Sequence, residues 1–163
     1  MSNPSAWLPP VISLNGPWEG VLLRLYQVFE KDFKLGRPEF EDRLVLWDSR
    51  ILPGDKYEEG FWHLISRDDR QTGQRLPDFR RAERLPWCAP TLRNSRDPVV
   101  KVWDHEEASG RVRTYLWLED LDYVVIVEKK EGRKRKLVFL VTAYYVDGDS
   151  ARRSLTRKHN HRL

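Results

Sequence analysis

The stretch that decides the fold is Leu137-Val-Phe-Leu-Val-Thr-Ala-Tyr-Tyr145, together with Tyr123-Val-Val-Ile-Val-Glu128 ahead of it. Both stretches are rich in β-branched and aromatic residues, which is typical of strands. Residues 124–127 and 137–141 are apolar on both faces, so we expect central strands with a helix covering one side. The basic segment 129–134 between them is expected to form the tip of a hairpin.

Two further runs of the same kind, residues 99–103 and 113–118, complete a four-stranded antiparallel meander. Ahead of the sheet, apolar residues recur at helical spacing over residues 17–35, and Gly36-Arg37-Pro38 follows as a stop signal. A lone helix of this length is marginal in water, so we expect it to pack on the sheet. The sequence predicts an α+β fold with N-terminal helices packed on a four-stranded antiparallel sheet.

The middle of the chain predicts shorter elements. Residues 43–47 and 61–67 are candidate strands, and residues 77–85 form a short Arg-rich helix that Pro86 interrupts. A helical turn or two is expected after Ser150. We expect three segments: an irregular arm over residues 1–15, a single nuclease-like domain over 16–158 and a polar tail over 159–163.

Charge points to a polyanionic partner. The chain has 29 Lys and Arg against 25 Asp and Glu, and its net charge is +4. The basic residues are concentrated in segments 70–96 and 129–162, where Trp and Tyr are interleaved with them. Such segments suit phosphate neutralisation and base stacking. The alternative is a solvated charged surface without a partner.

Cysteine content and hydropathy indicate the compartment. Cys88 is the only cysteine, so neither an internal disulfide nor a cysteine-based zinc site can form. The N-terminal sequence lacks the pattern of a cleaved signal, and no run of about 18 apolar residues occurs. A cytoplasmic protein that does not enter the membrane is expected.

The first candidate site is Gly60-Phe-Trp-His-Leu-Ile-Ser-Arg67. On a strand, alternation would place His63 and Arg67 on one face. An imidazole moves protons near neutral pH, and a guanidinium stabilises charge on a phosphorane, so the pair suits phosphoryl chemistry. The alternative is a structural histidine that hydrogen-bonds at a sheet edge.

The second candidate site is the Arg-rich stretch. If it is helical, Arg80, Arg81 and Arg84 lie close together on its surface, and Trp87 is available to stack on a base. The alternative is an exposed amphipathic helix whose arginines pair with acidic residues of the same stretch.

The third candidate site is on the last strand, where Thr142 and Tyr144 share one face. Hydroxyls are uncommon on an apolar central strand, so we expect them to reach a cleft. Tyr145, on the other face, is expected in the core. His105, beside Asp104 and Glu106, is expected in an exposed loop or strand end. His159 and His161 are expected in a disordered tail, with no cysteine nearby and an acidic ligand only at Asp147 or Asp149. None of the three enters the candidate site, and no metal site is expected.

These three pieces, in this order and with a basic hairpin before the last strand, resemble the barnase, EndoU, colicin D and RelE (BECR) superfamily of small ribonucleases. The likeness spans roughly residues 58–158 and is nearest to phage- or plasmid-borne toxins. It implies helices on a four-stranded antiparallel sheet that carries the active site. It also implies endoribonuclease activity without metal or other cofactor, and an acidic antitoxin or immunity protein as a partner.

By this resemblance, His63 is the catalytic acid or base, and Arg67 with Arg81 or Arg84 binds phosphate. Thr142 and Tyr144 form the polar end of the site. The ribose 2′-hydroxyl would attack the adjacent phosphate and give a 2′,3′-cyclic phosphate. The sequence departs from barnase in lacking an obvious strand Glu paired with a late catalytic His, so the second proton-transfer group is open between Tyr144 and a lysine such as Lys158.

Two other functions compete with the ribonuclease. A plain RNA- or DNA-binding module needs the same cations and aromatic rings but no imidazole converging with hydroxyls. A protein-interaction subunit would use exposed tryptophans as anchors, with Trp18, Trp47 and Trp103 as candidates. Separation of His63 by more than about 10 Å from both Thr142 and the arginine cluster would favour binding over catalysis.

Overall fold

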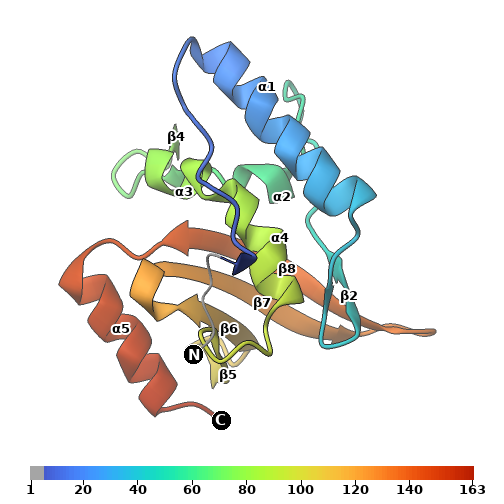
Figure 1. The fold of residues 1–163 in the computed structure, drawn as a ribbon, viewed down its shortest axis with the longest axis vertical. Helices are drawn as coiled ribbons and strands as arrows, with labels where there is room; N and C mark the ends of the chain where they lie inside the picture. The colour runs from blue at the N-terminus through green and yellow to red at the C-terminus, as the bar shows by residue number, and fades with distance from the viewer. Residues whose placement is uncertain (1–5) are drawn as a thin grey trace.

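The computed structural model describes residues 6–163, which form one mixed sheet, a small second sheet and helices on both faces of the mixed sheet (Figure 1). The helices are α1 (Trp18–Phe29), the π-helix η2 (Glu30–Leu35), α2 (Glu59–Trp62), α3 (Phe79–Glu83), α4 (Leu85–Arg93), the 3-10 helix η3 (Glu119–Leu121) and α5 (Gly148–Asn160). The strands are β1 (Glu39–Phe40), β2 (Arg43–Leu46), β3 (Ser66–Asp68), β4 (Arg75–Pro77), β5 (Lys101–Glu106), β6 (Val112–Leu118), β7 (Tyr123–Glu131) and β8 (Lys136–Tyr145).

The large sheet has the strand order β1-β2-β8-β7-β6-β5. The predicted antiparallel meander is present as β5 to β8, so the α+β class is confirmed. The expected limit of four antiparallel strands is wrong, because β2 lies parallel to β8 and β1 extends the sheet beyond it. A parallel pair formed across some ninety residues has no turn signal, so no local pattern could have shown it.

The helix expected over residues 17–35 is present as α1 followed by η2. Its buried side chains, Val21, Leu25, Phe29 and Phe33, recur every four residues and pack into the core between the helices and the sheet. With α2 to α4, this helix covers one face of the sheet (Figure 1).

The opposite face of the sheet is covered in part by α5, which is longer than the turn or two that was expected (Figure 1). Leu155 of α5 is 3% exposed and belongs to a second core with Trp103, Tyr115 and Trp117. The polar tail expected from residue 159 therefore starts inside α5, where His159 lies edge-on to Trp103. Trp103 is 4% exposed and offers no anchor to a partner.

The strand expected over residues 61–67 is wrong. The chain there forms α2, and His63 follows as its C-cap before the short strand β3 begins. The buried residues Phe61, Leu64 and Ile65 have helical spacing, and so short an apolar run does not distinguish helix from strand.

The Arg-rich helix expected over residues 77–85 is present as α3, whose N-cap Asp78 accepts a hydrogen bond from the main-chain N–H of Arg81 at 3.1 Å. Pro86 does not end the helical region, because it occupies the first turn of α4, where proline is tolerated.

The described part of the arm, residues 6–15, runs without strands across the helical layer. The main-chain N–H of Ile12 donates to Glu83 O at 2.9 Å, and Trp87 Nε1 donates to Pro9 O at 2.8 Å. The rest of the expected arm, residues 1–5, lies outside the described residues. Within residues 6–163, no helix has both the length and the apolar character that a membrane span requires.

Gly60 allows α2 to approach the end of β2. A Cβ at this position would lie 2.9 Å from Trp47 Cβ and 3.0 Å from the main-chain oxygen of Asp48. We expect Gly60→Ala to lower the free energy of unfolding by about 1–3 kcal/mol through overpacking. The matched substitution Gly20→Ala in α1, where the nearest atom is 3.8 Å away, should raise it by up to about 1 kcal/mol. Urea unfolding of both variants measures the difference, and equal effects would contradict the close approach.

Candidate functional site

The site lies along the part of β8 that pairs with β7 on one side and has no described strand on the other. β2 pairs with β8 only over residues 44–46 and 137–139, so the edge of β8 from residue 140 to 145 is left to other partners. Helices α2 and α3 contact this edge. They bring the region of His63 and the arginines of α3 to the last strand.

One main-chain oxygen joins the three elements. Thr142 Oγ1 donates to His63 O at 3.0 Å, and Arg81 Nη1 donates to the same oxygen at 3.0 Å. Arg81 Nη1 also lies 3.3 Å from Thr142 Oγ1, and its Nε lies 3.6 Å from Asp78 Oδ2. His63, Arg81 and Thr142 therefore lie together as expected, and the main-chain oxygen of His63 links them. We call this three-residue contact the joint.

A hollow of about 300 Å³ opens at this joint. Three arginines and one histidine line it, against a single carboxylate, and the lining residues are His63, Ser66, Arg67, Asp68, Arg75, Arg81, Val141 and Thr142. The excess of guanidinium groups makes the hollow suited to an anion. Its size excludes a large ligand but admits a phosphate group.

The imidazole of His63 is half-buried in the wall of this hollow. Its Nδ1 is shielded from solvent and has no hydrogen-bond partner among the described residues. Burial lowers the pKa of His63 below its usual value, and Arg75 and Arg81 act in the same direction, while Glu59 and Asp48 oppose them. Burial therefore favours the neutral form of the ring, which is the form that can accept a proton.

The three arginines differ in the contacts that their side chains make within the protein. Arg81 is 15% exposed and is held by the joint. Arg75 forms an ion pair with Glu59, and its guanidinium lies 5.5 Å from the ring centre of Trp62. Arg67 is exposed and makes no hydrogen bond or ion pair with any residue from 6 to 163. Arg67 is thus the cation that is free to bind a ligand.

A second, more open hollow of about 800 Å³ adjoins the first and shares Arg67 with it. Arg80 lines it, with the guanidinium 5.2 Å from the ring centre of Tyr145. Phe79, which is 59% exposed, and Tyr145 give it aromatic surface. A base next to a phosphate bound at Arg67 would have room here.

Five expected residues do not line the first hollow: Arg80 lines the second, and the other four have contacts elsewhere. The guanidinium of Arg84 lies between the rings of Trp87 and Tyr145, and Trp87 packs edge-on against Tyr123, so both have structural contacts. Tyr144 belongs to the core beneath α5, with the guanidinium of Arg81 over its ring at 5.5 Å. Lys158 donates to Tyr115 Oη at 2.9 Å on that same side of the sheet.

Arg75 is the lining residue that the sequence did not single out. It reaches the hollow because β3 and β4 form a hairpin in which Arg75 lies opposite Asp68. Asp69 caps the turn by accepting from the Thr72 hydroxyl at 2.7 Å, and Gly73 has a positive φ. The Asp-x-x-Thr-Gly pattern of a tight turn was the available signal.

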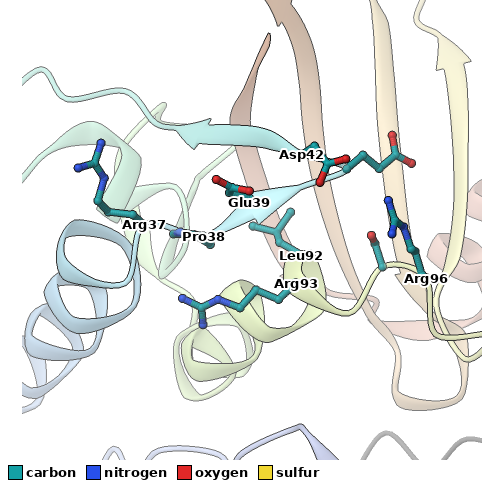
Figure 2. Close-up of a pocket in the computed structure, with 9 residues that line it drawn as sticks. Arg37, Pro38, Glu39, Asp42, Leu92, Arg93 and Arg96 are labelled. Carbon is teal, nitrogen blue, oxygen red and sulfur yellow. The ribbon is translucent and has the colours of Figure 1, made fainter. Parts of the chain in front are cut away.

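A third hollow, of about 360 Å³, lies between the β1–β2 turn and the end of α4 (Figure 2). Its lining has three arginines and three carboxylates: Arg37, Arg93 and Arg96 against Glu39, Glu41 and Asp42. This balance of charge makes it a poorer site for a polyanion than the hollow at His63. In residues 6–163, no group of three or more His, Cys, Asp or Glu side chains is arranged to hold a metal ion.

Comparison of the chain with protein-family models, with curated proteins and with solved structures gave no match. Geometry and charge are therefore the grounds on which a function can be assigned.

The burial of His63 makes its titration a test of the site. We expect its imidazole to titrate below the usual value of 6.5, because burial disfavours the charged form. The folded state binds this proton less tightly than the unfolded state, so this contribution to stability is present above about pH 6.5 and is lost as the pH falls through the folded pKa. NMR titration, with His63→Gln to assign the signal, measures it. A pKa at or above 6.5 would contradict the proposed environment.

Proposed function

We propose that the chain is a metal-independent endoribonuclease of the BECR type, with the scissile phosphate bound in the hollow at His63. One observation carries the proposal: the half-buried imidazole of His63 lines a small hollow together with three guanidinium groups. Transphosphorylation needs a proton acceptor beside positive charge, and this hollow supplies both.

The reaction follows from the two kinds of group. His63 accepts the proton of the ribose 2′-hydroxyl, the 2′-oxygen forms a bond to phosphorus, and the bond from phosphorus to the 5′-oxygen breaks. Arg67 and Arg75 stabilise the charge that develops on the non-bridging oxygens. The products are a 2′,3′-cyclic phosphate and a 5′-hydroxyl. Solvent supplies the proton to the leaving oxygen, because Tyr144 and Lys158 do not line the hollow.

A non-catalytic RNA-binding module is the second candidate. The observation that favours it is that Thr142 and Arg81 both bond to the main-chain oxygen of His63, as structural groups would. Binding alone would use Arg67, Arg75 and Arg80 and would not require the imidazole. A protein-interaction subunit has less support, since Trp103 is buried.

A toxin function would add an acidic antitoxin or immunity protein as a partner. Such a partner would cover the arginines of the hollow, and the opposite charges would speed association. This partner remains a prediction from the resemblance.

Substitution of His63 tests catalysis against binding. The joint uses the carbonyl of His63, so His63→Ala leaves it in place and removes only the imidazole. We expect His63→Ala to cleave RNA in EDTA about 10²–10⁴-fold more slowly than the wild type, because the general base is lost.

The matched control is His161→Ala at the exposed end of the chain, which should cleave at the wild-type rate. RNA affinity, measured with an oligonucleotide that cannot be cleaved, should change little in either variant. Cleavage by His63→Ala at the wild-type rate would refute His63 as the base, and RNA binding without cleavage by the wild type would favour the binding module.

A further inference from the structure

A row of side chains on the open part of the sheet has no role in the function proposed so far. It lies on the face that carries α5, because Trp103, Tyr115 and Ile126 of the core beneath α5 occupy the same face of β5, β6 and β7. Two residues further along these strands, on the same face, His105 of β5 lies opposite Arg113 of β6. The residues that continue the row are Glu128 of β7, Phe139 of β8 and Leu46 of β2.

Arg113 is the central cation of this row. Its side chain is half-buried, with Nε shielded, and forms no hydrogen bond or close ion pair with any described residue; Glu128 interacts with it only at longer range. A guanidinium held in this way has lost part of its hydration without gaining a partner, which is costly unless a ligand supplies one.

Glu128 is shared among three cations. Its carboxylate lies 2.6 Å from Lys130 Nζ and 3.8 Å from Arg111 Nη1, and Lys130, Arg111 and Arg113 all lower its pKa. Three cations, Arg111, Arg113 and Lys130, therefore face one carboxylate. The nearby Glu107 is bonded to Tyr115 and lies 3.4 Å from Lys158, so it is occupied as well.

The row also contains a histidine beside Arg113 and an aromatic ring on which a base could stack. His105 Nδ1 is shielded and has no hydrogen-bond partner in the described part of the chain. Phe139 lies opposite Glu128 and is partly exposed, and Leu46 beside it is 38% exposed. Cations next to an aromatic ring are the combination that single-stranded nucleic acid requires.

The row is continuous with the hollow at His63. Val141 lines that hollow and also packs against the core beneath α5, so the hollow opens onto this face of the sheet. Thr142 on β8 and Arg113 on β6 are two inter-strand spacings apart and offset by two residues along the strand, so their Cα atoms are about 12 Å apart. A strand of RNA leaving the hollow would cross this distance within a few nucleotides.

We infer that Arg113, with His105 and Phe139, forms a second phosphate subsite that holds single-stranded RNA on the sheet face. The inference rests on the proposed function, since the RNA must first occupy the hollow at His63. The substrate is then an unpaired segment of several nucleotides, because both subsites must be filled by one strand.

Salt-dependent binding tests the subsite without relying on cleavage. The probe is a fluorescein-labelled 2′-O-methyl oligouridylate of nine nucleotides, which has no free 2′-hydroxyl to attack. Loss of one phosphate contact should reduce the slope of log affinity against log salt by about 0.7. We expect this reduction, with a several-fold weaker affinity at low salt, for Arg113→Gln and for Arg67→Gln, and twice the reduction for the double variant.

Arg96→Gln is the matched control, because it removes the same charge from the balanced hollow of Figure 2 and should leave the slope unchanged. An unchanged slope for Arg113→Gln beside a reduced slope for Arg67→Gln would overturn the subsite and leave the hollow intact. Unchanged slopes for both would overturn RNA binding at the hollow too. An equal effect of Arg96→Gln would show only general attraction of charge and would overturn the subsite.

Discussion

The carbonyl oxygen of His63 accepts hydrogen bonds from Thr142 and Arg81, and the arrangement of the site depends on this junction. A neutral hydrogen bond contributes about 1 kcal/mol and one from a charged donor about 1.5–3 kcal/mol, so the junction is worth a sizeable part of a domain's stability. It holds α2 and α3 against the edge of β8 that β2 leaves open. The hollow exists because two short helices, and not a strand, cover that edge.

At this junction, some side chains make structural contacts, whereas others remain able to bind a ligand. Arg81 is desolvated, which lowers its pKa, and its contacts with the carbonyl and with Asp78 offset part of this cost. Beside it, the Arg67 side chain has no hydrogen-bond or ion-pair partner among the described residues, and burial lowers the pKa of His63. A similar contrast is present on the sheet face, where Glu128 lies 2.6 Å from Lys130 Nζ and the Arg113 side chain has no hydrogen bond among residues 6–163. Arg67 at the hollow and Arg113 on the sheet face are thus two arginines whose side chains remain available to one RNA strand.

The sequence predicted those elements whose pattern is long. Residues 137–145, 123–128 and 17–35 each have many apolar positions, so strand and helix could be distinguished. The parallel pairing of β2 could not be predicted, because its partner is remote in the chain. Residues 61–67 were mistaken for a strand because seven residues do not separate the two periodicities.

Only part of the candidate site could be predicted, because the remaining residues are brought together by contacts that no local sequence pattern shows. His63, Arg67, Arg81 and Thr142 do line one hollow, but His63 is the C-cap of α2 and Arg67 lies on β3, so strand alternation does not bring this pair together. Arg75 was missed because it depends on a hairpin. Arg113 was missed because only the register of β5, β6 and β7 places it beside His105 and Glu128. Trp87 and Lys158 were assigned from residue type, whereas tertiary contacts occupy both.

The chemistry of the cut ends tests the central claim most directly. An RNA oligonucleotide with a single 2′-deoxy substitution at a mapped cleavage position is incubated with the purified chain in EDTA, and the fragments are weighed by mass spectrometry. The account predicts 2′,3′-cyclic phosphate ends on the unsubstituted RNA and no cut at the substituted position. Cleavage at the 2′-deoxy position, or products with a 3′-hydroxyl and a 5′-phosphate, would contradict it.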